Sequence, residues 1–83
     1  MEIYSIMQVE AWAGDEEGSW NYNNVWNIGS VAVKETDDLK IIFQNWLDEN
    51  VGINWDVWEI RDDGYDVEVV NRETSEPIFC ICE

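Results

Sequence analysis

The chain has 83 residues, with 19 acidic and four basic side chains and no histidine, so its formal net charge at pH 7 is −15. Because phosphates are recognised by Lys and Arg, this charge excludes direct binding to nucleic acid and favours a basic partner or a cation. The length allows one domain over residues 1–83. Since 46% of the residues are hydrophobic, we expect that domain to fold rather than to stay disordered.

Two long segments at the start of the chain predict the first two strands. Residues 3–12 carry apolar and aromatic side chains on both faces, which is typical of an interior strand. The charged segment 14–18 has glycine at both ends and predicts a turn. Residues 20–34 are expected to return antiparallel to the first strand, with a bulge marked by Gly29.

Residues 36–50 predict the one helix of the chain. Thr36 can cap its first N–H groups, and five apolar side chains follow the spacing of a single buried stripe. These five are Leu39, Ile42, Phe43, Trp46 and Leu47. Asp48 and Glu49 stand near the C-terminal end, where they oppose the helix dipole without a local structural reason. The helix is expected to end at residue 50 or 52.

The remaining segments predict three further strands. Residues 55–61 and 65–72 form two of them, joined by the hairpin turn Asp62-Asp63-Gly64. A second turn at residues 73–76 leads to a short last strand over residues 78–82. Pro77 opens that strand, and a proline at this place fits the edge of a sheet.

The order of these segments predicts an α+β fold of the form ββαβββ. We expect an antiparallel sheet of four to five strands, with the helix packed on one face. One helix covers one face, so the other must meet solvent, a partner or a second copy of the chain. On the predicted register this open face carries Glu10, Trp12 and Glu68.

The two cysteines and the N-terminal segment bear on the compartment. Cys80 and Cys82 would point to the same face of the last strand, too far apart for an easy disulfide. The N-terminus has neither the basic region nor the long apolar run of a signal peptide. No stretch approaches the roughly 20 apolar residues of a membrane span. We therefore expect a cytoplasmic protein without a membrane partner.

The residue types present predict neither catalysis nor a metal site. Without histidine, an active site would rest on carboxylates, cysteines or tyrosines, and so small a domain with one helix is a poor frame for the cleft that paired acids need. The acids at 15–17 and at 62–68 do not match the spacing of a calcium loop. We expect a non-enzyme with no cofactor and no bound metal.

The acidic surface has three explanations. It can reflect a salt-adapted proteome, a charge field without a defined partner, or an interface for a positively charged groove. In the third case the carboxylates would replace the phosphates of a nucleic acid, and aromatic residues would supply the buried anchors that charge alone does not. Among the tryptophans, Trp12 and Trp20, which flank the acidic turn, are the best candidates for exposed anchors, although packing within the fold is favoured over exposure for each of them.

Three segments of the chain are similar to a group of small proteins encoded by phages of Gram-positive bacteria. They are IYSIMQVEAWAG, WNYNNVWNIG and NRETSEPIF, and the resemblance covers most of the chain. The resemblance supplies a phage context and no catalytic residue. Small acidic phage proteins are often inhibitors of host nucleic-acid enzymes, including anti-restriction and anti-CRISPR proteins.

These observations lead to the hypothesis of a phage-encoded inhibitor acting in the host bacterial cytoplasm. It would act as a nucleic-acid mimic and occlude the basic groove of a host defence nuclease. The residues expected to bind that partner are Glu10, Trp12, Asp15, Glu16, Glu17, Asp48, Glu49, Asp62, Asp63, Asp66 and Glu68. Two alternatives remain open. One is an immunity or antitoxin-like inhibitor of a toxin nuclease, and the other is a phage structural or assembly protein that forms a homodimer through the open sheet face.

Overall fold

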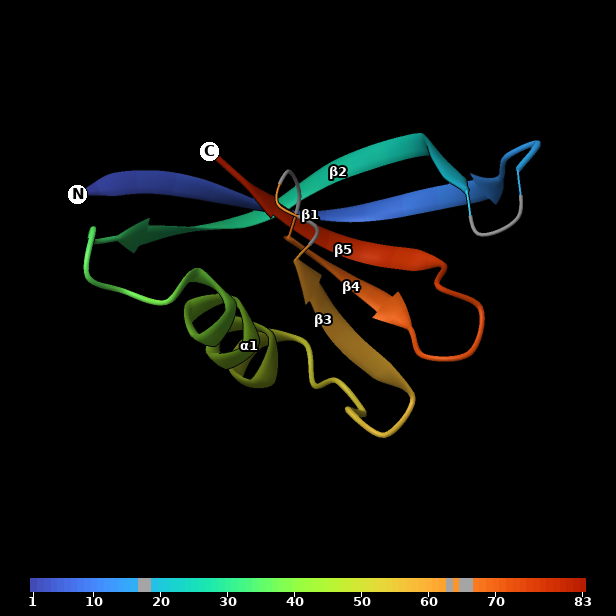
Figure 1. Cartoon of the computed structure of the whole chain (residues 1–83). Coiled ribbons are helices and arrows are strands. Elements are labelled where there is room, and N and C mark those ends of the chain that lie inside the picture. The colour runs from blue at the N-terminus through green and yellow to red at the C-terminus, as the bar shows by residue number, and fades with distance from the viewer. Residues whose placement is uncertain (17–18, 63, 65–66) are drawn as a thin grey trace.

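A computed structural model describes residues 1–16, 19–62, 64 and 67–83 as an α+β fold (Figure 1). Its elements are β1 (Glu2–Ala13), β2 (Trp20–Val33), α1 (Leu39–Asn50), β3 (Trp58–Asp62), β4 (Val67–Asn71) and β5 (Pro77–Cys82). The predicted order ββαβββ is confirmed. Within the described part of the chain, no helix is long and apolar enough to cross a membrane.

The five strands form one antiparallel sheet in the order β2-β1-β5-β4-β3. The interior position predicted for β1 is confirmed, since it lies between β2 and β5. The edge position predicted for the last strand is wrong, because β5 lies between β1 and β4. Pro77 is tolerated there because β1 pairs with β5 only at Phe79–Cys82, so one side of the strand is open at the proline.

The hairpin of β1 and β2 is longer than the rest of the sheet. β1 pairs with β2 as far as Ala13, whereas it pairs with β5 only through residues 5–8. Its register with β2 shifts twice, and the first shift places Ile28 as an extra residue beside Gly29. The predicted bulge is therefore confirmed. Beyond residue 8 the outer half of the hairpin, residues 9–13 and 20–25, separates from β5 (Figure 1).

The main core lies between α1 and the sheet. Phe43 and Leu47 are fully buried on the helix, and the strands contribute Ile6, Val67, Val69, Phe79 and Ile81. The predicted helical stripe is confirmed, with Leu39 and Trp46 partly buried against this cluster. The ring of Trp46 lies directly over Gly29, where a Cβ atom would overlap its Cζ2 atom.

The helix begins later than the sequence predicts. Asp38 is the N-cap, and its side chain accepts a hydrogen bond from the Lys40 N–H, so the predicted cap at Thr36 is wrong. Thr36 lies instead in a turn that two bonds close: Asp37 N–H to the Lys34 carbonyl at 3.0 Å, and Lys34 N–H to the Asp37 carboxylate at 2.9 Å. At the other end, the predicted limit is confirmed by Asn50 as the last helical residue.

The third strand is also shorter than predicted. Residues 55–57 form a turn, in which the N–H groups of Val57 and Trp58 both donate to the carbonyl of Asn54. The predicted hairpin between β3 and β4 is confirmed by the pairing of Asp62 with Val67, although Asp63 lies outside the described residues. The β4–β5 turn at residues 73–76 is confirmed as well.

The assignment of Glu10, Trp12 and Glu68 to one open face is wrong. Glu10 and Trp12 are four and six residues from Ile6 along β1, so they share the face of Ile6, which α1 covers. Glu68 pairs with Cys80 and lies on the opposite face. Register explains this error, since the faces depend on how β1 pairs with β5 on its second side, and β5 is distant from β1 in sequence. The face opposite α1 is also partly closed. Val9, Val70 and Cys80, which alternate onto that face, are each at most 5% exposed.

The contact of Trp46 with Gly29 gives a stability prediction. Gly29→Ala should lower the free energy of unfolding by about 1–3 kcal/mol, because the added methyl forces the indole or the bulge to move. Urea unfolding of the variant measures the loss. Ser30→Ala is the matched control at the next, exposed position and should change stability by less than about 0.5 kcal/mol. Equal midpoints for Gly29→Ala and the unaltered chain would contradict the packing.

Candidate functional site

Little of the negative charge is neutralised inside the fold. Among the residues that the structure describes, both ion pairs use the same acid, Glu59. Its carboxylate lies 2.6 Å from the Arg61 guanidinium and 3.1 Å from that of Arg72. The hydrogen bond from Arg61 lowers the pKa of Glu59. Since the two arginines contact one carboxylate, no other acid of the described residues is neutralised by an ion pair.

The two acids near the helix C-terminus lie on the surface, and one of them has a structural role. Asp48 and Glu49 are both exposed. Asp48 Oδ1 accepts a hydrogen bond of 2.7 Å from the indole N–H of Trp55. This bond ties the helix to the 55–57 turn. It is a structural reason for an acid at the end of the helix where the dipole disfavours one, and the sequence did not reveal it. Asp48 is thus at least partly a structural residue.

The predicted acids at 62–68 are divided between two roles. Asp62 is exposed at the end of β3, where Oδ1 accepts from the Gly64 N–H at 2.9 Å. Glu68 is half-buried and accepts a hydrogen bond from the hydroxyl of Tyr22, a residue of β2. Asp63 and Asp66 lie outside the described residues. Glu68 therefore helps to hold the outer half of the hairpin against β4.

The acids of the first turn lie at the tip of the hairpin. Asp15 and Glu16 are exposed in a turn closed by bonds from Gly14 N–H to the Ser19 carbonyl and from Ser19 N–H to the Glu16 carbonyl. Glu17, which was predicted with them, lies outside the described residues. The strands on either side hold these two carboxylates out into solvent.

The two tryptophans beside that turn differ. Trp12 is 54% exposed, as expected of an anchor. Trp20 is half-buried, and its indole N–H donates a hydrogen bond of 3.3 Å to the carbonyl of Thr74 in the β4–β5 turn. Trp20 therefore attaches the hairpin to a distant turn of its own chain.

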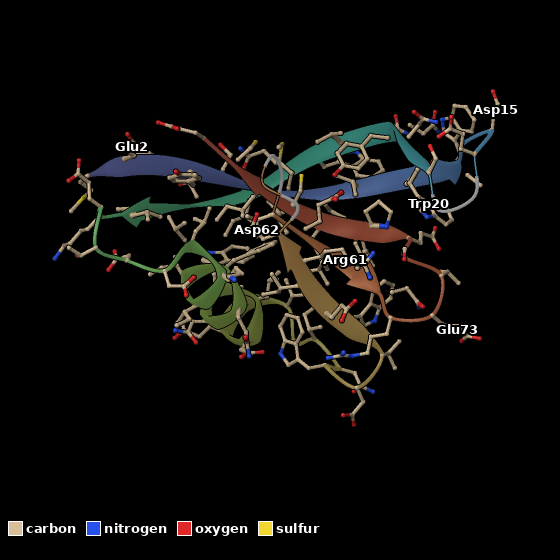
Figure 2. The ribbon with its side chains drawn as sticks, in the orientation of Figure 1. Glu2, Asp15, Trp20, Arg61, Asp62 and Glu73 are labelled. Carbon is tan, nitrogen blue, oxygen red and sulfur yellow. The ribbon has the colours of Figure 1, made fainter. Side chains whose placement is uncertain are left out.

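Those predicted acids that the structure describes do not gather on one face. Asp62 lies in the row of paired residues that continues through Val67 and Ile81 to Ile6 in the middle of β1. Asp15 lies beyond the end of β1, and the strand from Ile6 to Ala13 alone spans roughly 23 Å. Figure 2 shows the two acids in these separate places. Asp15 and Glu16 are therefore not part of one compact patch with Asp62.

The structure does bring other acids to the hairpin. The bond of Trp20 to Thr74 places the β4–β5 turn beside the outer half of the hairpin, and Figure 2 shows Asp15, Trp20 and Glu73 at the same end of the molecule. We call this the acidic end; its exposed carboxylates are those of Glu10, Asp15, Glu16, Glu73 and Glu76. The sequence predicted a turn at residues 73–76 but not its position beside the hairpin, since no local sequence pattern indicates a contact with residue 20.

A cleft of about 290 Å³ opens at the acidic end, where β1 and β5 separate. Its walls carry two acids and two tryptophans beside apolar side chains. It is lined by Gln8, Val9, Glu10, Ala11, Trp26, Trp58, Glu76, Pro77 and Ile78. Asn23 and Asn24 donate to Oε1 of Glu10 at 3.0 and 3.4 Å and so orient that carboxylate. The cleft thus combines carboxylates with aromatic side chains in its walls.

A further pair of carboxylates lies at the opposite end of the sheet. A hydrogen bond with Glu2, together with the charge of that residue, raises the pKa of Glu83. Figure 2 shows Glu2 far from Asp15. No group of three or more His, Cys, Asp or Glu side chains among the described residues is placed to hold a metal ion.

The fold and this surface define a small acidic α+β domain with a carboxylate-rich, aromatic end. Comparisons with protein-family models, with curated proteins and with solved structures found no match.

The attachment of the hairpin through Trp20 can be tested by mutation. Trp20→Ala should lower the free energy of unfolding by about 1–2 kcal/mol, because it removes a half-buried ring and a hydrogen bond. Amide exchange in residues 9–13 and 20–25 should accelerate. Trp12→Ala, the matched control with a more exposed ring, should cost less than about 0.5 kcal/mol. Equal effects of the two variants would mean that Trp20 does not hold the hairpin.

Proposed function

We propose that the protein is a phage-encoded acidic inhibitor that occupies the basic nucleic-acid groove of a host defence nuclease, such as a CRISPR effector or a restriction enzyme. The observation that carries the proposal is the net charge of −15 on a frame where the ion pairs of the described residues involve a single acid. Charge that is not neutralised within the chain is available to a partner. The resemblance to small phage proteins supplies the host context.

The density of this charge is comparable with that of a nucleic acid. The Cα frame measures 38 × 24 × 22 Å. A DNA duplex as long as the 38 Å axis would carry roughly 22 phosphate charges, at one per 1.7 Å. The protein carries 19 acidic side chains and a net charge of −15 over the same length. A groove that attracts a duplex would therefore attract this protein by a field of similar strength.

The acidic end is the part of the surface best suited to make the contact. Its carboxylates come from a hairpin and a turn that the Trp20–Thr74 bond joins, so they are held on a connected frame. Trp12 and Trp26 are 54% and 47% exposed and offer the large apolar contacts that give an interface its affinity. The long-range field would speed association, and these contacts would slow dissociation.

Occlusion is the whole mechanism under this proposal. The inhibitor would bind where phosphates bind and exclude the nucleic acid by mass action, without turnover and without a cofactor. Asp62 and Glu49, which lie away from the acidic end, would add to the field.

Competition tests the proposed function. Labelled DNA or guide-bound target is mixed with each of several host nucleases, and the pure protein is titrated in while fluorescence anisotropy is followed. We expect displacement at near-stoichiometric concentration at about 50 mM salt, weakening steeply by about 200 mM as the charges are screened. Failure to displace nucleic acid from any nuclease at low salt would contradict direct occlusion.

Charge reversal separates the acidic end from the general field. The double variant Asp15→Lys with Glu16→Lys should slow association with the target at least about tenfold. The matched control is Glu35→Lys with Asp56→Lys, which makes the same change of net charge at exposed positions elsewhere. Equal slowing by the two double variants would assign the effect to net charge and not to the acidic end.

A further inference from the structure

The cleft of the acidic end lies along an unpaired stretch of strand edge. β1 continues its pairing with β2 to Ala13, but its pairing with β5 ends at Gln8. In the described part of the chain, no strand pairs with the β5-facing edge of residues 9–13. Such an edge presents the N–H and C=O groups of alternate residues, which can pair with an extended segment of another chain.

The walls of the cleft have the chemistry that recognises a cationic side chain. Asn23 and Asn24 both donate to Oε1 of Glu10, which leaves Oε2 for a partner. The Glu76 carboxylate has neither a hydrogen-bond donor nor a base as partner among the described residues. Trp26 and Trp58 also line this cleft.

The size of the cleft limits what can enter. Its volume of about 290 Å³ is at the lower limit of small-molecule pockets. One long side chain fits such a space better than a whole ligand does. A planar guanidinium can stack on an indole and present its paired N–H groups to a carboxylate, which the ammonium of lysine cannot do.

We propose that an extended, arginine-containing segment of the target pairs with the free edge of β1 at residues 9–13. One arginine of that segment enters the cleft between Glu10 and Glu76 and stacks on an indole. The basic character of the target rests on the proposed function above; the edge and the cleft are features of this chain. A second copy of the chain is a poor occupant, because it carries the same charge of −15.

A synthetic peptide tests the strand pairing. The probe is a ten-residue peptide of alternating Arg and Thr, and the control is the same peptide with every second backbone nitrogen methylated. Both have the same charge, but the control lacks the N–H groups that a ladder needs. We expect the probe to bind at least about tenfold more tightly at 0.15 M salt, and to slow amide exchange in residues 9–13. Equal binding of the two peptides would overturn strand addition.

Matched variants test the cleft. Glu76→Gln and Trp26→Ala should each weaken binding of the probe at least about fivefold, whereas Glu35→Gln, which makes the same charge change elsewhere, should weaken it less than about twofold. A peptide with Lys in place of Arg should bind more weakly than the probe. Equal effects of Glu76→Gln and Glu35→Gln would reduce the interaction to the general field and overturn the assigned cleft. Circular dichroism of each variant verifies that it is folded.

The two proposals can fail separately. If Glu76→Gln and Trp26→Ala displace nucleic acid from the target as well as the unaltered chain does, the proposed occlusion stands, and the proposal that the cleft contacts the target is wrong. If the probe pairs with residues 9–13 while no nuclease loses its nucleic acid, the docking site stands and the proposed function is wrong.

Discussion

The constraint on which the rest of this structure depends is a negative charge that the fold does not neutralise. In the described residues, Arg61 and Arg72 both pair with Glu59, so the two arginines satisfy a single carboxylate. Cohesion must therefore come from apolar burial, and it is concentrated where α1 meets the sheet, with Phe43, Leu47 and Ile6 fully buried. The acids are held on the outside of that core, where they repel one another and are available to a basic partner.

Because the two pairings of β1 differ in length, several of these acids come to lie on one part of the surface. Because β1 pairs with β5 only through residues 5–8, the outer half of the hairpin leaves the sheet and has its own contacts. Trp20 reaches Thr74, so acids of the β4–β5 turn and of the hairpin lie at one end, and the bond from Tyr22 to Glu68 holds the hairpin to β4. The same separation opens the cleft with Glu10 and Glu76 and frees the strand edge beside it. The acidic end is thus a consequence of sheet topology.

The sequence predicted the elements better than their relations. The spacing of Leu39, Phe43 and Leu47 is a local, periodic signal, and it gave the helix and its buried side. The face of Glu10 was assigned wrongly because it depends on which strand β1 meets on its second side, a pairing between residues more than 70 positions apart. The helix start moved to Asp38 because Asp37 closes a competing turn. For the same reason of distance, Glu73 and Glu76 were missed: only the folded chain places them beside Trp20.

The salt dependence of stability tests most directly the claim that the acids are not neutralised within the fold. The free energy of unfolding should rise when NaCl is raised from about 0.01 M to about 0.15 M, because the Debye length falls from about 30 Å to about 8 Å and the repulsion between carboxylates is screened. The rise should be smaller in a variant with Glu35→Gln, Glu49→Gln and Asp56→Gln, which carries less charge on the same frame. A stability that stays constant or falls over this range would contradict the account, since the charges would then be balanced within the folded chain.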